Sequence, residues 1–391
     1  MSSEKQQLKI QKNRHTKQFR GVSVGQWGLL LFALSLLCLI LRNAPLAADC
    51  MRRALTLCAR TVIPSLFPFL VLSGMLAESG CGELLGKLAE KPCRLLFGLG
   101  GNSACALLMG LICGFPVGTK VAVSLHRRGL LDESALSRLI CLCNVPSPAF
   151  LIGAVGTSLM GNRSVGLWLY AACLLSVLVT ALFWRRSFPQ TPIAAETPPA
   201  HERCSLTTVL TRSVASASTS MLYICAYVAF FSVLSGILGQ IFAAFPHTDT
   251  ADGTIGALIA GFLELSGGVS LAASLPNRTC ALLLIAFFCG WSGMSVHMQI
   301  LSLCDGIHIG IRQYFLSKLL QGGLVAAFLA PVLHFMPHLL PASTSSCRPT
   351  APTALLALPS LTSPLSLPVN ILFGLCLIGT AAVLLRGRQH P

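Results

Sequence analysis

One carboxylate stands inside an otherwise apolar segment, and its position makes it the first candidate for chemistry. Among the 13 acidic residues, Glu264 lies within the apolar run 261–268, whereas the others fall in the N-terminal tail, in loops or at the ends of apolar runs. A carboxylate at membrane depth costs about 3 kcal/mol unless it is paired, protonated or wetted. Glu264 is therefore a candidate to take up a proton or Na⁺, or to accept hydrogen bonds from a solute. The alternative is a protonated carboxyl group that hydrogen-bonds a neighbouring helix.

A lysine follows a turn-forming string in another apolar run. The string 114–118 reads Gly-Phe-Pro-Val-Gly, and Thr119 and Lys120 come directly after it. A half-helix that begins near Val117 aims its positive end and its free N–H groups at the turn, so Thr119 and Lys120 are candidates for binding an anion. The alternative for Lys120 is a side chain that extends to the membrane surface.

Two long apolar segments are interrupted at their middles, at residues 143–148 (Cys-Asn-Val-Pro-Ser-Pro) and 289–293 (Cys-Gly-Trp-Ser-Gly). An interrupted helix frees backbone groups, which is tolerable at membrane depth only where they line a protein or water cavity. In transporters, such paired interruptions mark the substrate site. The further candidate solute-binding residues, near the interruptions and Glu264, are Asn144, Ser147, Ser266, Ser292, His297 and Gln299. Each can alternatively join two helices by a hydrogen bond, and His297 can also carry protons.

The composition places the chain in a membrane. Hydrophobic residues make up 54%, charged residues 10%, and the mean hydropathy is +0.73, values that soluble domains do not show. The basic residues behind the net charge of +15 lie between apolar runs and at the N-terminus. That placement is typical of topology signals and of contact with anionic lipids, and it argues against a nucleic-acid partner.

Motifs of enzymes and metal sites are absent from the sequence. It contains no nucleotide-binding loop, no G-x-S-x-G and no H-E-x-x-H. Cys141 and Cys143 form an isolated pair, and many of the 17 cysteines lie in apolar runs, where they behave as small apolar residues. We therefore expect no enzymatic activity, no cofactor and no metal.

The apolar runs predict an all-α polytopic membrane protein with eight full spans and two re-entrant hairpins. The spans are 27–41, 61–77, 136–159, 165–184, 214–241, 279–303, 314–335 and 366–386. The runs 104–125 and 254–275 carry turn residues at their centres, so each is expected to be a hairpin of two half-helices, with a full span as the alternative. Tyr314 and Lys318 begin a span and are expected to anchor it at the membrane interface.

The spans and the loops between them divide the chain into eight segments. They are a cytoplasmic basic tail (1–26), a first span (27–41), an interfacial segment (42–60), a first repeat (61–184), a cytoplasmic linker (185–213), a second repeat (214–335), an extracytoplasmic Pro/Ser/Thr-rich loop (336–365), and a last span with its tail (366–391). This topology places most basic loops in the cytoplasm. Arg42, Arg52, Arg53 and Arg60 fall on the opposite side, on an interfacial helix whose apolar face holds Leu46, Met51, Leu55 and Leu57.

The two repeats share a short string and an order of elements. Residues 71–76 (Val-Leu-Ser-Gly-Met-Leu) return at 233–238 as Val-Leu-Ser-Gly-Ile-Leu, and each copy precedes a Gly-broken run, an interrupted span and an unbroken span. Three spans and a hairpin in each half give the halves opposite orientations in the membrane. The sequence therefore predicts an inverted repeat with extra spans at both ends.

Several strings resemble the YlbJ-type sporulation integral membrane proteins, over about residues 45–335. The strings are 64–69 (Pro-Ser-Leu-Phe-Pro-Phe), 110–120 (Gly-Leu-Ile-Cys-Gly-Phe-Pro-Val-Gly-Thr-Lys), Asn144 ahead of 150–156, 264–267 (Glu-Leu-Ser-Gly) and 295–299 (Ser-Val-His-Met-Gln). The resemblance implies gate-type repeats like those of concentrative nucleoside transporters and of the membrane part of ferrous-iron transporters. The first interruption departs from the family pattern, because Asn144 leads into Val-Pro-Ser-Pro in place of a small polar residue and Gly-Pro.

The same resemblance implies a role in sporulation. It implies a bacterial multi-pass protein of the outer forespore membrane that moves a small anionic solute, such as dipicolinate, from mother cell to forespore. Expected partners are that solute, the lipid bilayer, a coupling ion (H⁺ or Na⁺) and other sporulation membrane proteins. The alternatives are a non-transporting sporulation scaffold and a nucleoside transporter. Iron transport is disfavoured, because the sequence has no GTPase domain and no cluster of Cys, His and carboxylate ligands.

Overall fold

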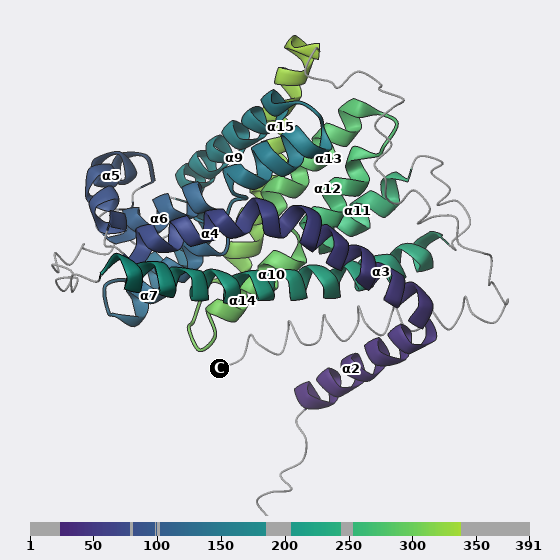
Figure 1. Ribbon diagram of the computed structural model, residues 1–391. Coiled ribbons are helices and arrows are strands. Elements are labelled where there is room, and N and C mark those ends of the chain that lie inside the picture. The colour runs from purple at the N-terminus through teal and green to yellow at the C-terminus, as the bar shows by residue number, and fades with distance from the viewer. Residues whose placement is uncertain are drawn as a thin grey trace, which may run out of the picture.

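The computed structural model describes residues 24–78, 81–97, 99, 102–184, 205–243 and 253–337, and every regular element among them is a helix (Figure 1). The all-α prediction is therefore confirmed for this part of the chain. Four helical stretches are long and apolar enough to cross a membrane: Arg163–Trp184, Leu206–Phe242, Arg278–Leu303 and Ile311–Phe335. The basic tail up to residue 23, most of the predicted linker 185–213, and the predicted loop and last span beyond residue 337 lie outside the described residues.

The N-terminal helices form a sharply bent pair. Helix α2 (Val24–Arg42) meets α3 (Ala44–Leu57) at 92°, and the two could together count as a fifth span. Helix α3 continues through a π-helical turn, η1 (Cys58–Val62), into α4 (Ile63–Glu78). Helix α3 buries Leu46, Ala47, Cys50 and Ala54 within the protein, whereas Met51 and Leu55 of the predicted apolar face are exposed.

Two helix pairs fold back on themselves. Helix α6 (Asn102–Cys113) and α7 (Val117–Arg127) are joined by a turn, and a side chain at Gly118 would lie 2.6 Å from the Cα of Gly110. A straight helix would hold residues eight apart about 12 Å from each other. Helices α11 (Thr254–Leu263) and α12 (Leu265–Ala273) likewise press Gly268 against Gly261. Both runs for which the sequence predicts hairpins therefore reverse direction.

Two other helix pairs are interrupted without folding back. Helix α8 (Glu133–Leu142) is separated from the π-helical η2 (Ala149–Leu159) by an irregular stretch with two prolines. Helix α13 (Arg278–Trp291) passes into α14 (Met294–Leu303) through two residues with positive φ, Ser292 (77°) and Gly293 (80°). These breaks lie where the sequence predicts interrupted spans. The predicted span 136–159 consists of two short helices, which explains why it does not count as one long span.

The unbroken helices set the directions of the two repeats. In α10 (Leu206–Ala243), Ser213 approaches Gly74 near the end of α4, whereas Gly236 approaches Cys50 of α3. The α3–α4 stretch and α10, which carry the two copies of the repeated string, therefore run antiparallel (Figure 1). At about 57 Å, α10 is longer than a bilayer core is thick.

The final helices of the repeats, α9 (Arg163–Trp184) and α15 (Ile311–Phe335), are antiparallel as well. One hydrophobic core contains Val165 of α9 and Leu333 of α15, and a second contains Ala181 and Tyr314. The α11–α12 hairpin contributes to the first core and the α6–α7 hairpin to the second. The hairpins thus enter the helical body from opposite ends.

Candidate functional site

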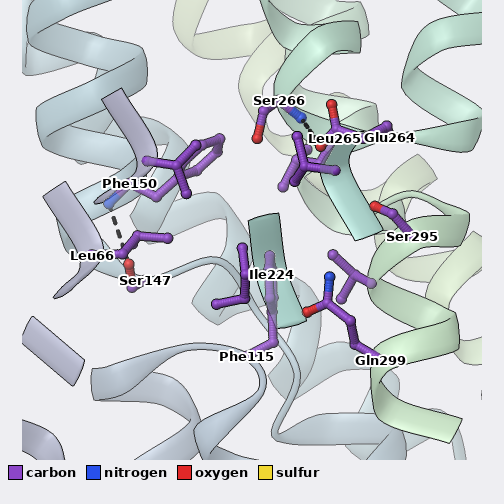
Figure 2. A pocket seen from close by; sticks show the side chains of 13 residues that line it. Leu66, Phe115, Ser147, Phe150, Ile224, Glu264, Leu265, Ser266, Ser295 and Gln299 are labelled. Carbon is purple, nitrogen blue, oxygen red and sulfur yellow. Dashed lines mark hydrogen bonds between the residues drawn. The ribbon is translucent and has the colours of Figure 1, made fainter. Parts of the chain in front are cut away.

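A small cavity lies where both hairpin turns, the first interruption and α14, the helix after the second interruption, meet. Its wall includes Phe115 from the first hairpin turn, Glu264 from the second, Ser147 from the first interruption, and Ser295 and Gln299 from α14 (Figure 2). Helices α4 and α10 close the remaining side with apolar residues. The cavity measures about 30 Å³, enough for one or two water molecules but not for an organic solute.

Glu264 caps the second half-helix of its hairpin. Its side chain is 2% exposed, and its two carboxylate oxygens accept hydrogen bonds from the backbone N–H groups of Ser266 (2.8 Å) and Gly267 (2.5 Å). Backbone donors and the positive helix end stabilise a negative charge at this position. Neither sequence-based alternative for Glu264 included this capping role. Glu264 is also one of the residues that line the cavity.

The second interruption supplies polar atoms without partners. Ser292 Oγ, Ser295 Oγ, His297 Nε2 and Gln299 Oε1 are buried and make no hydrogen bond within the described protein. A buried acceptor or donor that is left unsatisfied costs about 1–3 kcal/mol. Ser295 and Gln299 line the cavity, so a bound solute or water would satisfy them there. His297 instead pairs through Nδ1 with the Tyr314 hydroxyl at 2.7 Å and does not line the cavity.

Gly293 allows this interruption to approach the second hairpin. A Cβ atom at Gly293 would lie 2.9 Å from the backbone nitrogen of Leu265, and its φ of 80° disfavours any other residue. The Trp291 indole N–H also donates to the Phe262 carbonyl at 3.1 Å. The hairpin turn and the interruption of the second repeat are therefore held together as one unit.

The first interruption is tied to the first hairpin in a similar way. Thr119 Oγ1 donates to Asn144 Oδ1 at 2.7 Å, and the Phe115 backbone N–H donates to the Val145 carbonyl at 3.0 Å. The Asn144 amide donates to the carbonyl of Ile140 at 2.7 Å, which satisfies one of the acceptors freed at the end of α8. Thr119 and Asn144 thus hold the backbone around the cavity and do not line it.

Helix α15 satisfies two more of the freed carbonyls. Lys318 Nζ donates to the Asn144 carbonyl at 2.5 Å, and Gln321 Nε2 donates to the Cys141 carbonyl at 2.9 Å. The side chains of Lys318 (0% exposed), Gln321 (1%) and Tyr314 (1%) are all buried. The prediction that Tyr314 and Lys318 anchor the span at the membrane interface is therefore wrong. A basic residue near the start of a span suggests snorkelling, but here it faces α8.

Lys120 lies away from the cavity. Its side chain is exposed, and its ammonium donates to Ser216 Oγ of α10 at 2.5 Å. Of the nine residues that the sequence suggests as solute ligands, the structure gathers Ser147, Glu264, Ser266 and Gln299 at the cavity. It places Thr119, Asn144, Ser292 and His297 in the surrounding layer.

Sequence reasoning missed Ser295 as a cavity residue and Lys318 as a buried cation. The signal for Ser295 was its place directly after the second interruption, three residues past Ser292. The walls of the cavity hold hydroxyl, amide and carboxylate groups, and no Lys or Arg of the described chain is among them. The hydroxyl, amide and carboxylate side chains of the wall can bind a solute or a small cation through their oxygen atoms.

The comparisons with known proteins agree with the strings found in the sequence. No family model matches the chain. The chain is 24% identical over 330 residues to the sporulation integral membrane protein YlbJ of Bacillus subtilis (strain 168), and the alignment covers 76% of this chain and 80% of that protein. The resemblance drawn from the motifs is thus confirmed, and the chain is a YlbJ homologue. With its apolar helices, it is a multi-pass integral membrane protein that is similar to YlbJ.

Proposed function

We propose that this protein is a secondary transporter or gated permease of sporulation, not an enzyme, and that it moves a small solute through the cavity between its two repeats. The observation that carries the proposal is the convergence of both hairpin turns, the first interruption and α14, which follows the second interruption, on one cavity whose largely apolar wall carries hydroxyl, amide and carboxylate groups. Interrupted helices that meet at a repeat interface are how transporters build a substrate site near the midplane. The similarity to a sporulation membrane protein supports the biological setting, and we place the protein in the outer forespore membrane.

The small cavity corresponds to a closed state. A volume of about 30 Å³ excludes a solute the size of an aromatic dicarboxylate. Transport therefore requires one hairpin to withdraw from the opposite repeat, which would widen the cavity on one side of the membrane. Because the two hairpins enter from opposite ends, withdrawal of either one opens a different side.

A small anion such as dipicolinate is the first solute to test. The α12 N-terminus lies at the cavity, and α7 begins two residues after Phe115, so two positive helix ends are near a bound anion. Glu264 would repel an anion unless it carried a proton. A solute carboxylate beside Glu264 would share one proton with it, as close carboxylate pairs do.

A neutral, hydroxyl-bearing solute is the second candidate. The described cavity wall contains a carboxylate, an amide and serine hydroxyl groups but no basic side chain. These groups suit the hydroxyl groups of a nucleoside without any need to protonate Glu264. This composition of the wall is the observation that favours the alternative.

The experiment is solute counterflow with the purified full-length chain in liposomes. Vesicles loaded with unlabelled dipicolinate or uridine should accumulate the same labelled solute transiently. Glu264→Gln should reduce counterflow by at least about tenfold, the effect of losing roughly 1.4 kcal/mol of solute binding. Glu133→Gln, at an exposed carboxylate of α8, is the matched control and should behave as wild type.

A scaffold that recruits other sporulation proteins predicts a different pattern. It tolerates Glu264→Gln and Lys120→Gln but not deletion of residues 2–20. Normal dipicolinate content in spores that carry Glu264→Gln, together with no counterflow of either solute, would replace the transport proposal with the scaffold.

A further inference from the structure

Lys318 is a buried cation that the proposed solute site does not use. Its side chain is 0% exposed, and its ammonium donates to the Asn144 carbonyl at 2.5 Å and to Gln321 Oε1 at 2.8 Å. Within the described residues, Lys318 forms no ion pair with a carboxylate. A buried charge is expensive, so this ammonium is held by dipoles where a neutral residue would have sufficed for packing.

The dipoles around the ammonium are those that bind coupling cations in other transporters. Helix α8 ends at Leu142, and its last carbonyls, together with that of Asn144, point away from any continuing helix. Unwound carbonyls and the negative ends of half-helices coordinate Na⁺ in transporters with broken helices. Here the place at the first interruption is filled by Lys318, and Gln321 holds the neighbouring Cys141 carbonyl.

The groups that face Lys318 do not compensate its charge. The titratable side chains that interact with it electrostatically are Cys141 of α8, Cys143 directly after α8, Cys173 of α9 and His297 of α14. None of them is a carboxylate. Gain or loss of one proton at Lys318 would therefore change the charge at the interruption by one full unit.

We infer that Lys318 is the coupling-ion site of this protein, with its ammonium in the place of Na⁺, so that transport is coupled to H⁺ through this amine. The inference rests on the transport function proposed above. In the step that returns the empty site across the membrane, an Nζ–H bond breaks and the proton passes to water that has entered the opened site. The neutral amine holds the Asn144 carbonyl less strongly, since charge-assisted hydrogen bonds are about twice as strong as neutral ones. The first interruption can then separate from α15, and uptake of a proton from water on the other side restores the contact.

The test separates exchange from net, gradient-driven uptake in liposomes that contain the full-length protein. Counterflow of labelled dipicolinate or uridine at equal pH reports exchange. Uptake against an imposed pH difference of one unit, at zero membrane potential, reports coupling. One accompanying proton gives about tenfold accumulation, the equivalent of about 1.4 kcal/mol. Replacement of all Na⁺ by choline should change neither result.

Lys318→Arg is the decisive variant, because arginine keeps the charge and the donors but does not deprotonate in proteins. We expect it to retain counterflow and to lose accumulation. Lys318→Gln removes the charge, and its counterflow and pH-driven accumulation are measured in the same two assays. Lys91→Gln, at an exposed lysine of α5 (Cys81–Phe97), should accumulate solute as wild type does.

Four outcomes would overturn the inference. A Lys318→Arg protein that accumulates solute about tenfold would show that Lys318 only holds the two helices together. Accumulation driven by Na⁺ in the wild type would also overturn the inference, without the use of any variant. Wild-type counterflow without pH-driven accumulation refutes the inference alone, whereas absence of counterflow for both solutes refutes it together with the transport proposal.

Discussion

A double-mutant cycle on Thr119 and Asn144 tests how firmly the first hairpin is joined to the first interruption. Their hydrogen bond measures 2.7 Å, and both side chains are 0% exposed. Hydrogen bonds between helices of membrane proteins average about 0.6 kcal/mol, with a maximum near 1.7 kcal/mol. The complete burial and short distance place this one in the upper part of that range. We expect a coupling free energy of about 1 kcal/mol between Thr119→Val and Asn144→Ala.

Reversible unfolding in mixed micelles with increasing SDS, followed by tryptophan fluorescence, gives the free energies of unfolding. Thr180→Val is the control, because the Thr180 hydroxyl is equally buried but donates to the Ser176 carbonyl of its own helix at 2.7 Å. Thr119→Val should cost at least about 0.5 kcal/mol more than Thr180→Val, since it leaves Asn144 Oδ1 unsatisfied. Equal costs for the two valine variants, or a coupling energy within error of zero, would show that the Thr119–Asn144 hydrogen bond does not join the hairpin to the interruption.

Three further predictions concern the backbone of the site. Ser292→Gly should raise the free energy of unfolding by about 1 kcal/mol, because Ser292 has a φ of 77° and a buried hydroxyl without a partner in the described protein. A destabilised variant in the same SDS titration would show that the hydroxyl is bonded. Gly268→Ala should lower the free energy of unfolding by about 1–3 kcal/mol, because the added methyl group meets the backbone of Gly261. Wild-type stability would mean that the α11–α12 hairpin is more open. Cysteines introduced at the exposed positions Arg128 and Asn277 should react with an impermeant thiol reagent from opposite sides of the membrane, and labelling of both from one side would contradict the inverted repeat.

The helical architecture could be predicted because its signals are local. Glycine and proline mark the first hairpin turn and the first interruption, and the structure reverses or breaks the chain at those places. The second hairpin instead turns at Glu264, and the predicted turn residues Ser266, Gly267 and Gly268 lie inside α12. The bend between α2 and α3 carries no such strong signal, although Asn43 and Pro45 lie beside it. The length of α10 was underestimated, because its first turns are polar enough to resemble a linker.

The candidate site could be predicted only in part, because burial depends on which helix face meets which neighbour. Glu264 was singled out by its charge within an apolar run, and it lines the cavity. Lys120 and Lys318 have similar signals in the sequence, since each follows the start of a helix by a few residues. Packing separates them: Lys120 meets a serine of α10 at an exposed position, whereas Lys318 is enclosed by α8 and α9. No periodicity in the chain distinguishes these two environments.

Counterflow by Gln299→Leu tests most directly whether the cavity is the path of the solute. Gln299 Oε1 is buried, lines the cavity and has no hydrogen-bond partner in the described protein, so leucine removes an unsatisfied acceptor while it keeps similar bulk. We expect that the stability in SDS is unchanged or higher, and that counterflow of the transported solute falls by at least about tenfold. A stable Gln299→Leu protein with wild-type counterflow would show that the solute does not pass through this cavity.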